Sequence, residues 1–291
     1  MELDDFAKKY ISLGLRINKH INGYVEHYYG PRELKTKVNN ERKSSPKKLL
    51  EDCNVLLNKI KNQGFEPRRQ KFLQKNIEAM EIILRKLNGE HIPYLVQVEK
   101  LFDFKPILYR DDFFYNLTLK ADELYNGKGK LHDRIAKYSE KRMIPIKDII
   151  NHYIKTIHIA RERTKQCFPK LLPNNEKITI SEVNNVSWLM YCWYQGNFFS
   201  KIEINVSKIH YWTNLLHFGC HEVYPGHHTE RLLKEYYLFR NKGYFETSIL
   251  LIYTPELVIS EGMGLLAERV LFDPTESIRI LLENILSNQK V

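Results

Sequence analysis

Apolar residues recur every three or four positions through most of the stretch from residue 3 to residue 166, which is the pattern of amphipathic helices. The spacing of Phe6, Tyr10, Ile17 and Tyr24 predicts a first helix over residues 3–28. The same pattern predicts further helices over residues 45–61, 67–87, 93–102, 111–125, 131–141 and 145–166. The first half of the chain is therefore expected to be a helical assembly with short connections.

The pattern changes near Pro173. Residues 177–183 and 198–206 alternate apolar and polar positions, residues 187–194 are apolar and aromatic, and Gln195-Gly196-Asn197 is a plausible turn, so a small antiparallel sheet is predicted. Helical periodicity returns from about residue 209, with helices predicted to end near residue 221 and to cover residues 229–239, 255–271 and the stretch after 274. The prediction is a mostly α (α+β) protein with a helical region 1–172 and a second region 173–291, joined in one continuous structural unit.

The composition is that of a folded protein, with 43% hydrophobic and 27% charged residues among 291. The net charge of +10 is uneven, because residues 1–150 hold 30 basic against 21 acidic side chains. Such an excess could attract nucleic acid. The densest basic runs, Lys47-Lys48 and Arg68-Arg69-Gln70-Lys71, are short and the basic residues are interleaved with acids. A basic nucleic-acid-binding helical protein is therefore kept only as an alternative.

The sequence also bears on location. The four cysteines form no CxxC pair, which fits thiols in a reducing compartment. The start Met1-Glu2-Leu3-Asp4-Asp5 lacks the basic and apolar regions of a signal peptide. No stretch approaches the roughly 20 apolar residues that span a bilayer. A cytoplasmic location with no membrane partner is the expectation.

The densest chemistry lies in residues 221–230, where His221, Glu222, His227 and His228 occur within eight positions. A His-Glu pair followed by a histidine is typical of the zinc-binding motif HExxH. On a regular helix His221 and His227 would be about 240° apart and could not share a metal ion. Pro225 removes a hydrogen bond to the His221 carbonyl and clashes with it, so the helix is expected to break there. His227 could then reach the metal, with His228 as the alternative.

Residues 221–228, His-Glu-Val-Tyr-Pro-Gly-His-His, resemble the HExxPGHH motif of the bacterial domain-of-unknown-function family 885, which is assigned to the gluzincin group of zinc metallopeptidases. Residues 260–268, Ser-Glu-Gly-Met-Gly-Leu-Leu-Ala-Glu, are similar to the EGWALYAE segment of that family, with Met263 and Leu266 in place of its aromatic residues. The resemblance implies one Zn²⁺ per chain, a small sheet beside a zincin-like active-site helix, and Glu261 as the third ligand. The implied metal-binding set is His221, His227 and Glu261, with His228 as the other candidate.

Further roles follow from metal-assisted hydrolysis. Glu222 is the expected general base. Tyr224, His210 and the unused histidine are candidates for contact with an oxyanion, and Glu268 for orienting a histidine. The sheet edge around residues 198–206 could pair with an extended peptide. Aromatic residues are expected in the core rather than in a substrate site: Trp188, Tyr191, Trp193 and Tyr194.

These observations favour a zinc-dependent metallopeptidase that cleaves small peptides. The family's members extend beyond the equivalent of Val291, so the first alternative is an inactive or truncated relative that binds metal or a partner without turnover. A zinc hydrolase acting on another kind of bond would share every ligand.

Overall fold

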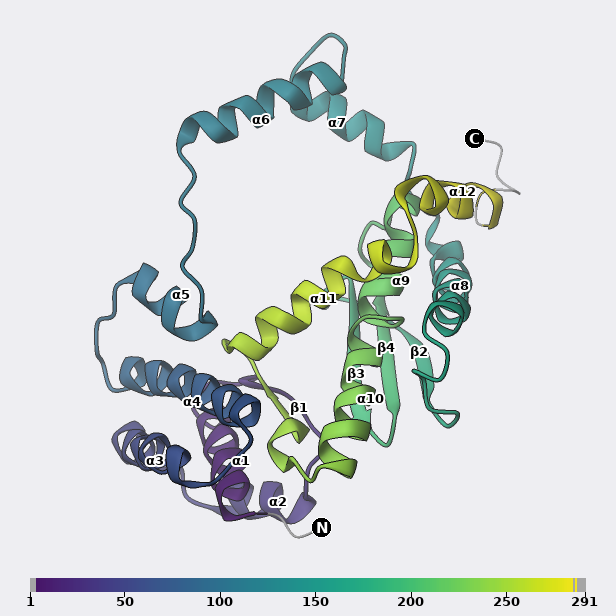
Figure 1. Ribbon diagram of the computed structural model, residues 1–291. Coiled ribbons are helices and arrows are strands. Elements are labelled where there is room, and N and C mark those ends of the chain that lie inside the picture. Colours follow the sequence, from purple (N-terminus) through teal and green to yellow (C-terminus); the bar gives the residue numbers. More distant parts are fainter. Residues whose placement is uncertain (1–3, 285, 287–291) are drawn as a thin grey trace.

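The computed structural model describes residues 4–284 and 286 (Figure 1). Helices make up 62% of it and strands 11%, which confirms the mostly α (α+β) class. The helices before the sheet are α1 (Asp5–Asn18), α2 (Arg32–Asn40), α3 (Pro46–Lys59), α4 (Pro67–Leu87), α5 (Tyr94–Phe102), α6 (Asp111–Leu124), α7 (Leu131–Glu140) and α8 (Ile149–Cys167), with short 3-10 turns η1 (Ile60–Asn62) and η2 (Ile146–Asp148). Most of these match the predicted ranges within a few residues.

The first predicted helix is wrong in its second half. Helix α1 ends at Asn18, and residues 25–28 form the strand β1 (Val25–Tyr28), which pairs antiparallel with β5 (Ile249–Leu251). Gly23 has a positive φ of 80°, a conformation that glycine adopts without strain and that a helix does not contain. Tyr24 is nevertheless fully buried, because the apolar spacing continues into the strand. The helix α2 was not predicted.

The first hydrophobic core lies among α1, α3 and α4, and it also includes Ile249 and Leu251 of β5. Leu13, Leu49 and Leu73 are among its fully buried side chains. Segments from both sides of residue 173 therefore meet in the β1–β5 pair and in this core. Figure 1 shows these helices gathered near the N-terminus, at the opposite end of the molecule from α12.

The main sheet contains β2 (Lys177–Val183), β3 (Met190–Gly196) and β4 (Phe199–Asn205) in the order β2-β4-β3. Strands β3 and β4 form the antiparallel hairpin that the sequence predicts, with Gly196 and Asn197 at positive φ in the turn. Strand β2 runs parallel to β4, so the sheet is mixed. Strand β4 is central, which corrects the prediction that residues 198–206 form an edge open to a peptide.

The remaining helical elements follow the sheet: η3 (Trp212–Asn214), α9 (Leu215–Glu222), α10 (His227–Leu233), the π-helical segment η4 (Lys234–Asn241), η5 (Phe245–Ser248), α11 (Pro255–Leu271) and α12 (Pro274–Asn284). Helix α9 packs between α8 and α11, and a second core joins them to the sheet. The start of α11 at Pro255 matches the expected preference for proline in the first helical turn.

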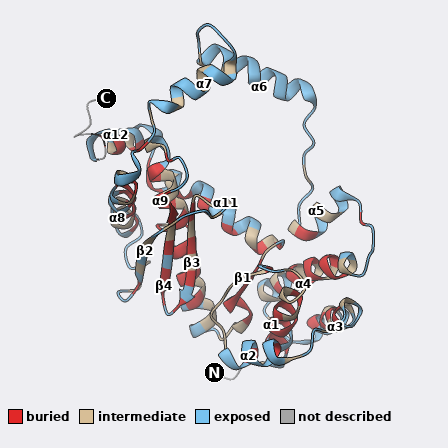
Figure 2. Ribbon diagram, turned by 180° about the vertical axis from the view of Figure 1, so that it is seen from behind, coloured by how far each residue is buried: buried red, intermediate tan, exposed pale blue. Residues whose placement is uncertain are grey.

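Helices α6 and α7 differ from the rest, because neither contains a buried residue. They project from the body as an arm, drawn almost entirely pale blue in Figure 2. Two aromatic side chains of this arm, Phe114 and Tyr115, are more than half exposed. In the described part of the chain no helix is long and apolar enough to cross a membrane.

Candidate metal centre

The chain breaks its helical path between the two histidines, as the sequence predicts. Helix α9 ends at Glu222, and α10 begins at His227. The intervening Tyr224–Pro225 peptide bond is cis. The Thr229 hydroxyl and amide both donate to the carbonyl of Val223, at 3.1 and 3.2 Å, so the start of α10 is tied back to the end of α9. Residues 223–226 therefore separate two helices that remain close together.

Gly226 lies against the end of α9. Its amide donates to the carbonyl of Cys220 at 2.9 Å. A Cβ atom at this position would lie 1.8 Å from the carbonyl oxygen of His221 and 2.4 Å from that of Cys220. Only glycine permits this approach of two backbone segments, and the approach brings the first residue of α10 beside the last turn of α9.

Three side chains meet at this junction: His221 of α9, His227 of α10 and Glu261 of α11. One donor atom from each lies within 4.8 Å of the other two. The Nε2 atoms of His221 and His227 are both 3.5 Å from an oxygen of Glu261. Two ligands of a tetrahedral zinc ion are separated by about 3.3 Å, given bonds of roughly 2.0 to 2.1 Å. Two imidazoles and a carboxylate are also the donor set of many catalytic zinc sites, so these residues fit the ion.

The three donors differ in exposure. The side chains of His221 and His227 are 12% and 6% exposed, whereas that of Glu261 is 51% exposed. Hydrogen bonds from His221 and His227 hold the pKa of the Glu261 carboxyl well below its usual range, although partial burial opposes this. Glu261 is therefore an anion on the solvent side of two nearly buried imidazoles, and a site of this kind can be reached from outside.

His228 does not join the three donors, which corrects its place among the candidate ligands. Its side chain is fully buried and both of its ring nitrogens are engaged, Nδ1 with the Ser200 hydroxyl at 2.8 Å and Nε2 with Glu176 at 3.1 Å. Burial lowers the pKa of His228, which favours the neutral ring that donates from Nε2 and accepts at Nδ1. Because His227 and His228 are neighbours on one helix, they point about 100° apart, and only one can face α9 and α11.

His227 has further polar neighbours on the side away from Glu261. The Ser260 hydroxyl lies 3.3 Å from His227 Nδ1 and donates to Glu230 Oε2 at 2.5 Å, while that carboxylate oxygen is 3.9 Å from Nδ1. Burial alone would lower the pKa of His227, but the nearby carboxylates of Glu230 and Glu261 prevail and raise it to about 9. A hydroxyl and a carboxylate at Nδ1 fix the ring so that Nε2 faces the other two donors.

His221 is held by close packing instead. A Cβ atom at Gly264 would lie 2.8 to 2.9 Å from three atoms of the His221 ring, so the imidazole rests on the bare backbone of α11. Its Nδ1 atom is buried and has no hydrogen-bond partner in the described structure. Glu268, proposed to orient a histidine, lies 3.5 Å from His217 Nδ1 and not beside His221. The His217 and His221 rings lie with their centroids 5.8 Å apart.

Glu222, the expected general base, ends α9 next to His221 and is 8% exposed. Burial raises the pKa of its carboxyl, and the nearby His227 and His221 oppose this rise. A carboxylate with a raised pKa is a better proton acceptor near neutral pH than an ordinary surface glutamate. The position therefore suits acid–base chemistry beside the three donors.

The other candidate contacts have structural partners. The Tyr224 hydroxyl donates to Glu176 Oε2 at 2.6 Å, and His210 lies between the Tyr153 hydroxyl and the Asn205 carbonyl. Both groups are thus engaged by partners other than the three donors. Of the four aromatic residues expected in the core, Tyr194 is buried. The other three are half-buried and pack on one another: Trp188, Tyr191 and Trp193.

Three residues that sequence reasoning missed support this centre. Glu230 lies three positions after His227, a spacing that brings side chains together on a helix and could have been noticed. Ser260 directly precedes Glu261. Glu176, which is bound by Arg161, Tyr224 and His228, lies in the loop before β2 and carries no signal in the sequence.

Comparison of the chain with protein-family models, with curated proteins and with solved structures yields no match in any of the three.

Proposed function

We propose that this protein is a zinc-dependent hydrolase, most specifically a metallopeptidase acting on small peptides. The observation that carries the proposal is the convergence of His221, His227 and Glu261, whose donor atoms lie within 4.8 Å of one another. These residues come from three helices, and the two histidines are brought together by a break that the sequence motif itself encodes. Two imidazoles and a carboxylate form the donor set of many catalytic zinc sites.

The chemistry assigned to the site is hydrolysis by an activated water. A zinc ion held by these residues would act as a Lewis acid toward a carbonyl oxygen and lower the pKa of a water. Glu222 would take the proton of the attacking water and pass it to the leaving amine. His221 and His227 would hold their Nε2 atoms toward the ion, and Ser260 and Glu230 would keep the His227 ring in that orientation.

The resemblance of residues 221–228 and 260–268 to the two motifs of family 885 supports the same proposal. The resemblance is the reason for proposing a peptide substrate, because the geometry alone suits any metal-assisted hydrolysis. Ser260, in the second motif, lies 3.3 Å from His227, in the first motif, although the two residues are 33 positions apart. The two motifs are therefore in contact in this fold. The reaction class thus draws on geometry, and the substrate class on resemblance.

The test combines metal analysis with a peptidase assay. The purified protein is expected to hold one zinc per chain and to cleave members of a short-peptide library. Glu222→Gln should keep the zinc and lose at least a hundredfold in rate, since general base catalysis contributes about 10² to 10⁴. Glu99→Gln, at an exposed position far along the chain, is the matched control and should match the native rate.

Each outcome has a distinct meaning. Zinc without hydrolysis of any peptide would favour the inactive relative, and hydrolysis of esters or amides alone would favour another kind of zinc hydrolase. The proposal would be overturned if the native protein held no stoichiometric zinc after loading and hydrolysed no substrate.

A further inference from the structure

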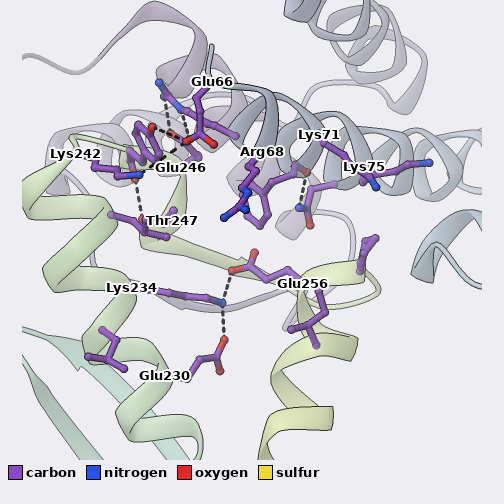
Figure 3. Close-up of a pocket in the computed structure, with 18 of the residues that line it drawn as sticks. Glu66, Arg68, Lys71, Lys75, Glu230, Lys234, Lys242, Glu246, Thr247 and Glu256 are labelled. Atoms are coloured by element: carbon purple, nitrogen blue, oxygen red, sulfur yellow. Dashed lines mark hydrogen bonds and ion pairs between the residues drawn. The ribbon is translucent and has the colours of Figure 1, made fainter. Parts of the chain in front are cut away.

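A cavity of about 820 Å³ lies between α4 on one side and α10, η4 and α11 on the other (Figure 3). Pockets of roughly 300 to 1,000 Å³ typically hold small organic ligands. None of the three metal-binding side chains lines it, so this cavity is a separate feature of the molecule.

Part of the cavity wall is apolar. The apolar lining includes Phe72 of α4 together with Leu233, Leu238, Ile259 and Met263. Met263 is 45% exposed and Ile259 is 64% exposed, so both side chains are accessible to a ligand in the cavity. The wall therefore suits a ligand with an apolar body.

The charged part of the wall has six cationic and five carboxylate side chains. Most of the cations are neutralised by ion pairs across or beside the cavity: Arg69 with Glu246 at 2.6 Å, Lys75 with Asp103 at 2.8 Å, Lys234 with Glu256 at 2.8 Å and with Glu230 at 2.5 Å, and Lys242 with Glu66 at 3.8 Å. Within the described residues, Arg68 and Lys71 have no carboxylate partner. Arg69 also pairs with Asp4 at 2.8 Å and Lys75 with Glu78 at 3.1 Å. Arg68 and Lys71 are thus the two cations of the wall that are left to pair with an added anion.

Arg68 and Lys71 belong to the basic run 68–71 that stands out in the sequence, and both lie in the first turns of α4. Three residues apart on a helix, they share a face. In Figure 3 the Arg68 side chain points from α4 toward the space above Lys234 and Glu256. The positive end of the α4 dipole adds to their field. The basic run thus faces an apolar cavity, which distinguishes it from an ordinary solvated helix face.

The cavity and the metal-binding residues lie on different sides of α11. Ile259 and Met263 line the cavity, whereas Glu261, two positions from each, lies nearly opposite at about 100° per residue. The two sites share only Glu230, which lines the cavity and accepts a hydrogen bond from Ser260 beside His227. A ligand can therefore occupy the cavity without contacting the metal-binding residues.

We propose that this cavity is a second binding site, for an organic acid with an apolar body the size of a short peptide, whose single carboxylate pairs with Arg68 and Lys71. Arg68 and Lys71 line the cavity and have no carboxylate partner among the described residues, so a carboxylate of the ligand can pair with both. A phosphate would bring nearly two negative charges into a wall that already holds five carboxylates, among them Glu256, whose Oε2 atom has no hydrogen-bond partner in the described structure. Arg68 presents a planar fork that suits a carboxylate, and Lys71 adds a point charge.

The test measures binding by calorimetry to the full chain stripped of metal with a chelator. The probes are N-acetyl-leucyl-phenylalanine and its C-terminal amide, which have the same apolar body and differ in charge. The acid is expected to bind at least about tenfold more tightly than the amide. The double variant Arg68→Gln/Lys71→Gln should weaken the acid about tenfold and leave the amide unchanged, and both residues are exposed enough for the fold to tolerate the change.

The matched control is Arg42→Gln/Lys43→Gln, which removes the same charge from two exposed residues outside the cavity that have no ion pair among the described residues. It should bind the acid as the native protein does. Equal weakening in both double variants would show only general electrostatic attraction and overturn the proposal. So would undetectable binding of the acid, tighter binding of phenyl phosphate than of the acid, or binding that requires zinc. Because the metal-free protein is used, failure here is distinct from failure of the proposed peptidase activity.

Discussion

Gly226→Ala tests whether the break between α9 and α10 is what assembles the candidate metal centre. The new Cβ atom would lie 1.8 Å from the His221 carbonyl oxygen and 2.4 Å from that of Cys220. Both contacts are with backbone, which cannot rotate away as a side chain would. To reach even 3.0 Å from the nearer oxygen, the Gly226 backbone must move by about 1.2 Å relative to the end of α9.

That displacement is large for a metal site. The clash is between the new Cβ atom, in the residue before His227, and the carbonyl oxygen of His221. Relieving it therefore moves the two histidines apart. Ligand distances in a zinc site tolerate about 0.2 Å. We expect zinc affinity to fall at least a hundredfold, and the free energy of unfolding of the metal-free protein to fall by about 1 to 3 kcal/mol, the usual cost of overpacking.

The assay is zinc competition against a fluorescent chelator, with circular dichroism to verify that the helices are present. Gly262→Ala is the matched control, because it makes the same change in α11 next to Glu261 and its Cβ would meet no atom within 4 Å. The control should keep native zinc affinity and gain up to about 1 kcal/mol from helix propensity. A folded Gly226→Ala variant that binds zinc as tightly as Gly262→Ala would refute the reasoning.

Two further predictions concern the buried network behind the metal centre. His228→Gln should keep one zinc per chain, with an affinity within a few-fold of the native value, whereas His227→Gln should lose zinc. Dialysis followed by metal analysis distinguishes the two results. Loss of zinc in both variants would return His228 to the set of candidate ligands. Glu176 is held by His228, Tyr224 and Arg161, and although burial opposes it, these contacts lower the pKa of its carboxyl from 4.5 to about 2. Its contribution to stability is therefore present above about pH 4.5 and is lost as the pH falls toward 2. Urea unfolding from pH 7 to pH 3 should show a shallower acid loss for Glu176→Gln than for the native protein, and identical slopes would contradict this account.

Local pattern was sufficient for most helices. The periodicity of α3, α4 and α11, together with Pro46, Pro67 and Pro255 in their first turns, fixes them nearly to the residue. The pattern failed after Asn18, because Ile21 and Tyr24 continue a helical spacing while β1 pairs with a strand more than two hundred residues away. Pairing over such a distance is invisible to a local window. The same limit explains why the parallel position of β2 and the central position of β4 were not foreseen.

The sequence by itself determined the parts of the candidate centre that depend on neighbouring residues. Pro225 cannot continue a helix and Gly226 alone permits the close approach, so the break, and the freedom of His227 to face His221, are encoded locally. The motif resemblance added Glu261. Tertiary structure decided every contact between residues far apart in the sequence. Glu176 and Ser200 hydrogen-bond the two ring nitrogens of His228, and the His221 ring packs on Gly264. The basic run of α4 lines a cavity together with residues of α11. These outcomes require the packing of several helices at once, because no single segment contains both partners of any of these contacts.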